Sequence, residues 1–133
     1  MTSAINTAVT PITGDDGGPF PDGLANSGIP ASLAALGSTQ ATAALITSKN
    51  TMVTGADGSK GVVLPVPAYP GEERFIFNSA ASDLKIWPAV GGYLVGATNA
   101  PGKDTNILME DYSAAILMAQ ADLLTWAVIY TAG

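Results

Sequence analysis

Short apolar segments separated by Pro and Gly dominate the stretch from Gly61 to Trp126. This stretch opens with GVVLPVPAYPGEERFIFN and closes with NILMEDYSAAILMAQADLLTW. Each segment is about four to eight residues long and ends at a turn signal, which is typical of the strands of a compact all-β domain. We therefore predict a single antiparallel β-sandwich or jelly-roll-like barrel of about eight strands.

Alternation within the segments predicts which side chains face the core. In GEERFIFN, Phe75 and Phe77 fall on the opposite face from Ile76 and Asn78, because successive side chains of a strand point to opposite sides. We expect the aromatic pair to point into the core. Further upstream, two apolar segments between residues 40 and 54 predict a β-hairpin.

The segment 111–126 supports two interpretations. It is rich in Ala, Leu and Met, and Asp111 or Ser113 would be a suitable N-cap, so local propensity favours a helix. However, the segments on both sides of it look like strands, and a hairpin turn fits at its polar residue Asp122. We predict two strands that are joined near Ala121 and Asp122.

The first 30 residues differ in composition from the rest. Prolines and glycines recur in them closely enough to prevent a regular helix or a central strand. We predict an extended N-terminal arm over residues 1–38, in which Ser32–Leu36 forms a short helical connector that ends at Gly37. The β-sandwich or barrel body then covers residues 39–133.

Isolated apolar residues along the arm are the candidate partner-binding residues. They are Ile5, Val9, Ile12, Phe20, Leu24 and Ile29. Burial of six side chains does not offset the conformational entropy of about 30 ordered residues, so we expect the arm to be ordered only by contacts with something else. We interpret it as a segment that reaches across an assembly; the alternative is an arm that wraps around its own domain.

The composition argues against catalysis. The chain has no His and no Cys, so it lacks the commonest general base, the commonest zinc ligands and a thiol nucleophile. Its carboxylate pairs are Asp15 with Asp16, Glu72 with Glu73, and Glu110 with Asp111. Adjacent carboxylates on a strand point to opposite faces. We predict no enzyme activity, no catalytic residue, no metal site, no cofactor and no small-molecule substrate.

Charge is sparse and negative. Charged residues make up 12% of the chain and its net charge is −6, whereas about 25% charged residues is typical. A thinly charged chain suggests a surface that is hidden against partners; the alternative is a weakly charged monomer. The negative sign argues against binding to nucleic acid or to an anionic membrane. We also expect no export signal and no membrane span.

The order of segments in the body carries a resemblance. The matching pieces are Thr39–Ala43, Gly61–Pro65, Gly71–Asn78, Leu84–Pro88, Gly91 with Gly92, and Trp126. In this order they resemble the segments of tailed-phage virion proteins, in particular small capsid decoration proteins. The match covers residues 39–130. Residues 1–38 match nothing in that group, and Tyr93–Gly96 stands near the place where the group often has an Asn-Gly step.

The resemblance implies a structural role in a virion. We expect a cement, or head-stabilising, protein on the outer capsid surface, assembled in the host cytoplasm, that forms a homotrimer and stabilises contacts between major capsid subunits. Its partners would be the major capsid protein and other copies of itself. The alternative is a tail fibre or spike module that binds a host receptor or glycan, with Tyr69, Trp87, Tyr93 and Tyr112 as aromatic platforms.

Overall fold

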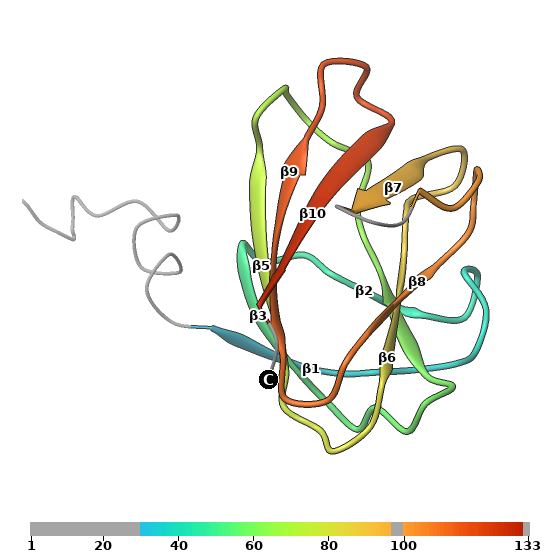
Figure 1. The fold of residues 1–133 in the computed structure, drawn as a ribbon, viewed down its shortest axis with the longest axis vertical. Coiled ribbons are helices and arrows are strands. Elements are labelled where there is room, and N and C mark those ends of the chain that lie inside the picture. Colours follow the sequence, from blue (N-terminus) through green and yellow to red (C-terminus); the bar gives the residue numbers. More distant parts are fainter. Residues whose placement is uncertain (1–29, 97–99, 132–133) are drawn as a thin grey trace, which may run out of the picture. The chain divides into compact units, whose positions relative to one another are not determined.

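The computed structural model describes residues 30–96 and 100–131. Within these ranges the chain forms ten strands and no helix (Figure 1), and therefore no helix long and apolar enough to cross a membrane. The strands are β1 (Ala31–Ala34), β2 (Ala44–Leu45), β3 (Asn50–Thr54), β4 (Gly61–Val63), β5 (Glu73–Asn78), β6 (Leu84–Trp87), β7 (Tyr93–Gly96), β8 (Ile107–Met109), β9 (Ala114–Ala119) and β10 (Thr125–Thr131).

The strands form two mixed sheets. One has six strands in the order β1-β3-β5-β9-β10-β7, and the other has four in the order β2-β4-β6-β8. Strands β1, β3 and β5 run parallel, as do β2, β4 and β6, whereas β9 and β8 pair with these groups in the antiparallel direction. The all-β prediction is confirmed. The prediction of purely antiparallel pairing is wrong.

The chain crosses between the two sheets after every strand from β1 to β8. Up to β9, the odd-numbered strands lie in the six-stranded sheet and the even-numbered strands in the other one; β10 then follows β9 within the six-stranded sheet. Parallel neighbours cannot be joined by a tight turn and need a crossover. Here a strand of the opposite sheet is the crossover. The hairpin predicted between residues 40 and 54 is therefore wrong, because β2 and β3 belong to different sheets.

The predicted helical connector is a strand. Strand β1 pairs in parallel with β3, and beyond it the amide of Ala35 donates to the carbonyl of Thr54 at 2.8 Å. Gly37 then has φ of +58°, and a Cβ at this position would overlap the side chain of Thr42. Pairing with β3 thus overrides the helix preference of Ala and Leu. Ala31–Ala34 therefore belongs to the sheet, although it lies upstream of residue 39, where the body was predicted to start.

One hydrophobic core takes side chains from both sheets. Val53, Ile76 and Trp126 come from the six-stranded sheet, and Val62 and Ile86 come from the other. All of these side chains are almost completely buried. Each large apolar side chain that is buried in this way contributes about 1.5–3 kcal/mol, so the shared core is the main source of cohesion between the sheets.

Strand β5 faces the core with the residues that were predicted to point away from it. Ile76 and Asn78 are buried, whereas 39% of Phe77 is exposed and Phe75 is half-buried. Ile76 lies between Thr51 of β3 and a residue of β9 that is also buried. The prediction that the aromatic pair points into the core is wrong, and the pair lies on the outer side of the sheet.

The prediction of two strands in the segment 111–126 is confirmed. Strands β9 and β10 pair antiparallel, from Ala119 opposite Trp126 to the far end of the hairpin. In the turn, the Asp122 carboxylate accepts hydrogen bonds from the amides of Leu124 and Thr125 at 3.0 Å each, and Leu123 takes φ of +57°. A carboxylate that bonds its own turn favours this local structure over a helix.

A buried amide side chain ties β5 to two loops. The Asn78 amide nitrogen donates to the carbonyl of Ser82 at 2.8 Å and to the carbonyl of Glu110 at 3.0 Å. Its side-chain oxygen accepts from the amide of Ala80 at 3.1 Å. Asn78 is 0% exposed. Because no solvent can replace these partners, the side chain fixes the turn after β5 and the loop after β8 together.

Replacement of this amide should be costly. We expect Asn78→Ala to lower the free energy of unfolding by about 2–3 kcal/mol, because it removes the three hydrogen bonds of a completely buried side chain and leaves a cavity. Asn106→Ala is the matched control, since that side chain is half-buried and its amide donates only to the neighbouring carbonyl of Ile107; it should cost less than about 1 kcal/mol. Urea unfolding measures both. Equal losses in the two variants would contradict this role of Asn78.

Candidate functional site

The outer face of the six-stranded sheet, the side that points away from the core, carries large exposed apolar side chains. They come from five of the six strands, and between 36% and 59% of each is exposed. They are Met52, Phe77, Tyr93, Val95, Ile116, Met118 and Ile129. Large contiguous apolar patches are uncommon on soluble monomers and mark interaction sites. This outer face is the candidate functional site.

Cross-strand register makes the outer face continuous. Met52 of β3 lies opposite Phe77 of β5, and Ile116 of β9 lies opposite Ile129 of β10. A further row runs from Met118 through Ala127 to Val95. Neighbouring strands are about 4.8 Å apart, so side chains in one row touch. Strands β3, β5, β9 and β10 are neighbours in the sheet (Figure 1), so the register gathers residues that are far apart in sequence into one apolar surface.

The outer face carries very little charge. Among the outward-facing positions of the six-stranded sheet within the described residues, Glu73 alone is charged; it is half-buried and lies opposite Met118. Beside it, the Lys49 ammonium lies 5.9 Å from the centroid of the Phe75 ring. One acid and one base therefore border the same part of the face. The remainder offers a partner apolar contact and almost no electrostatic attraction.

The four-stranded sheet has a smaller and less uniform outer side. Leu45 and Leu108, on its two edge strands, are 53% and 52% exposed. Between them lie half-buried Trp87 and Lys85, with the Lys85 ammonium 6.0 Å from the centroid of the Trp87 ring. A cation near the middle of this side distinguishes it from the outer face of the six-stranded sheet.

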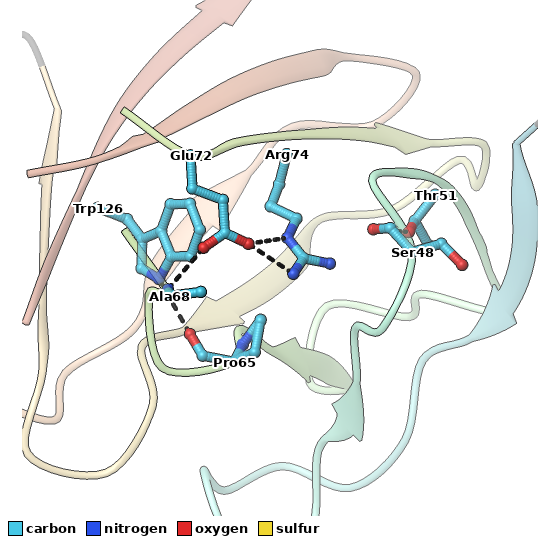
Figure 2. Close-up of polar contacts among 7 residues, drawn as sticks. All are labelled: Ser48, Thr51, Pro65, Ala68, Glu72, Arg74 and Trp126. Carbon is cyan, nitrogen blue, oxygen red and sulfur yellow. Dashed lines mark hydrogen bonds and ion pairs between the residues drawn. The ribbon is translucent and has the colours of Figure 1, made fainter. Parts of the chain in front are cut away.

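A cleft of about 280 Å³ contains an ion pair with a structural role. Arg74 donates to one oxygen of Glu72 through Nη2 at 2.7 Å and Nε at 3.2 Å, and the other oxygen accepts from the amide of Ala68 at 2.7 Å (Figure 2). Next to it, Trp126 Nε1 donates to the carbonyl of Pro65 at 3.2 Å. Together these bonds hold the loop between β4 and β5. Both oxygens of Glu72 are thus engaged.

The other carboxylate pairs of the sequence do not form a reactive cluster in the described part of the chain. Glu110 and Asp111 are exposed in the turn before β9. No group of three or more His, Cys, Asp or Glu side chains that could hold a metal ion occurs among the described residues. Asp15 and Asp16 lie outside them.

Hydrogen bonds to loop residues favour the ionised form of three aspartates, of which Asp57 and Asp122 are exposed and Asp104 is half-buried. Hydrogen bonds from the Ser59 amide, the Ser59 hydroxyl and the Lys60 amide lower the pKa of Asp57 to about 2. The amide of Gly91 lowers the pKa of Asp104, and the amide of Leu124 lowers the pKa of Asp122. Each carboxylate accepts bonds from the backbone, which favours its charged form. These aspartates stabilise loops.

The structure describes only some of the site residues that were predicted from the sequence. The six arm residues Ile5, Val9, Ile12, Phe20, Leu24 and Ile29 lie outside the described residues. Of the aromatic platforms, Tyr69 and Tyr112 are exposed in loops, and Tyr93 is on the outer face. Trp87 lies on the opposite sheet from Tyr93. The structure therefore does not gather the four rings into one site.

Sequence reasoning missed the outer face. Alternation gives two faces for each strand but does not say which one is buried. A usable signal was present, because ERFIFN, AAILMA and TWAVIY carry apolar residues at both alternating positions. A strand of that kind is either covered on both sides or exposes an apolar face to a partner.

The stability of the protein should depend on pH through Asp57. Its pKa of about 2 in the folded protein lies below the value of about 3.9 in an unfolded chain. Its stabilising contribution is therefore fully present above about pH 4 and is lost as the pH falls toward 2. Asp57→Asn should be less stable than the wild type at pH 6, and thermal unfolding should show this difference shrinking toward pH 2. A difference that does not change with pH would contradict the assignment.

Comparison of the chain with protein-family models, with curated proteins and with solved structures found no match.

Proposed function

We propose that this chain is a viral structural protein: a capsid decoration, or cement, protein of a tailed phage. It binds the outer surface of the phage head as a homotrimer and stabilises contacts between major capsid subunits, after assembly in the host cytoplasm. The observation that carries this proposal is the nearly uncharged, exposed outer face of the six-stranded sheet. Such a face suits a protein that works by being buried in an assembly.

The order of segments in the body supports the same role. The pieces from Thr39 to Trp126 resemble those of small phage decoration proteins, which are β-sandwiches or barrels. We propose that the two sheets around the shared core form a β-sandwich. In this proposal the body is a passive scaffold, without catalysis, cofactor or small-molecule substrate, and it contacts neither nucleic acid nor a membrane.

The N-terminal arm is the proposed contact with the major capsid protein. Residues 1–29 contain six separate apolar residues and no Lys or Arg. A segment of about 29 residues spans up to about 100 Å when extended, which is enough to reach across neighbouring subunits. Symmetric repetition of such weak contacts in a trimer raises avidity without additional chemistry.

A second candidate function is a tail fibre or spike module that binds a host glycan. The observation that favours it is the cleft beside Glu72 and Arg74, where Tyr69, 59% exposed, is one of the lining residues. A tyrosine ring next to charged and polar groups suits a sugar. Copy number separates the two functions: quantitative mass spectrometry of purified particles should find this chain at a level comparable to the major capsid protein if it is a decoration protein, and far below it if it belongs to a fibre.

Serine replacement of the six arm residues tests the capsid contact. We expect the variant with Ile5, Val9, Ile12, Phe20, Leu24 and Ile29 all changed to Ser to occupy undecorated capsids at least about tenfold less tightly, because each lost apolar contact is worth about 1.5–3 kcal/mol. Co-sedimentation with capsids measures the occupancy. The matched control changes Ala4, Ala8 and Ala25 to Ser and should bind normally. Undiminished occupancy by the six-serine variant would refute the arm contact.

A further inference from the structure

We propose that the outer face of the six-stranded sheet is the surface through which copies of this chain bind one another. In this arrangement the outer face of each copy turns toward a common symmetry axis and contacts the same face of the neighbouring copies. This inference rests on the proposed function, in which the protein forms a homotrimer on the capsid, and it identifies the surface that joins the three copies.

The size of the outer face suits an interface between subunits. Six strands at spacings of about 4.8 Å, and about six residues along the longer strands, give a face of about 24 Å by 20 Å, or about 500 Å². Three such faces turned toward one axis, each meeting both of its neighbours, bury about 1,500 Å² in total within the trimer. The face is therefore large enough to hold another copy and is at the upper end of what monomers leave exposed.

The composition of the outer face favours a partner of the same kind. Met118, Ile116 and Ile129 form its middle, and exposed donors and acceptors are few there. A charged or strongly polar partner would lose hydration on this surface and gain no hydrogen bonds in return. The middle of the same face in another copy is equally apolar, so contact there buries few polar groups.

The distribution of charge also favours another copy of the chain as the partner of the outer face. The chain has a net charge of −6, so two copies repel each other over most of their surfaces. The outer face is an exception, because Glu73 is its one described charge and Lys49 lies beside it. Contact through this face therefore brings the copies together where repulsion is weakest.

The other sheet provides a matched comparison. Leu45 and Leu108 on its outer side are more exposed than every large apolar residue of the outer face except Ile129. However, Lys85 lies on that side, near Trp87. A trimer that met there would bring three ammonium groups close together. This side is thus disfavoured as the contact between copies.

The experiment is sedimentation equilibrium of the full chain, without capsids. The wild type should form an oligomer with three times the monomer mass of 13.4 kDa. The variant Met118→Lys/Ile129→Lys should dissociate, with its dissociation constant raised about a hundredfold or more. These changes reduce the net negative charge, so added repulsion between −6 chains cannot cause the dissociation. Lys at position 118 would lie opposite Glu73 on β5, which favours folding.

The matched control is Leu45→Lys/Leu108→Lys, which makes the same charge change at strand positions of similar exposure. It should remain an oligomer. If the double variant of the outer face does not fold, as judged by circular dichroism, Ile129→Lys alone replaces it, since Ile129 is the most exposed residue of the face at 59%. A monomeric wild type at about 100 μM, well above the dissociation constants typical of specific assemblies, or dissociation of the control alone, would overturn the inference.

Salt gives a second readout on the wild type. Association through an apolar face between like-charged copies should hold or strengthen as NaCl is raised to about 0.5 M, because salt screens the repulsion. Weakening would overturn the inference in favour of a contact between opposite charges. Failure of this inference can be distinguished from failure of the proposed function. A trimer that does not occupy capsids would contradict only the decoration role. A monomer that occupies capsids would contradict only the assignment of the outer face as the contact between copies.

Discussion

The structure depends on one constraint: both sheets share a single core, and every strand presents only one of its two faces to that core. Nearly all connections cross from one sheet to the other, so the core is built by strands that alternate between its two sides. The opposite face of each strand is left outside. Because several strands of the six-stranded sheet are apolar on both faces, the same constraint that forms the core also creates an exposed apolar surface.

Along each strand, residues that face the core alternate with residues that face the exposed surface. In β5, Ile76 is buried and Phe77 is not; in β9, Leu117 is buried and Met118 is not. The buried amide of Asn78 fixes this choice, since its three hydrogen bonds to loops require it to point inward. A shift of one position would bury the aromatic pair and leave those bonds unmade. The hydrogen bonds of Asn78 thus help to select the buried face of β5.

The sequence predicted the strands better than their pairing. Turn signals located β5 and β6, and the Asp122 turn identified the β9–β10 hairpin, because these features are local. The parallel pairing of β1 with β3 and of β3 with β5 involves residues 20 and 25 positions apart, respectively, and no local pattern encodes it. For the same reason Ser32–Leu36 was predicted to be a short helix, although Ser32, Leu33 and Ala34 belong to β1. The candidate site was missed because alternation leaves open which side is covered.

The central claim is that the outer face is buried between copies of the chain, and methionine oxidation tests it most directly. Met52 and Met118 are 37% and 38% exposed on this face, whereas Met109 is 0% exposed in the core. Hydrogen peroxide oxidises accessible methionines, and mass spectrometry reads each site. We expect Met52 and Met118 to be protected at high protein concentration and to react faster than Met109 after dilution. Equal oxidation of Met52 and Met118 at both concentrations would contradict burial of this face.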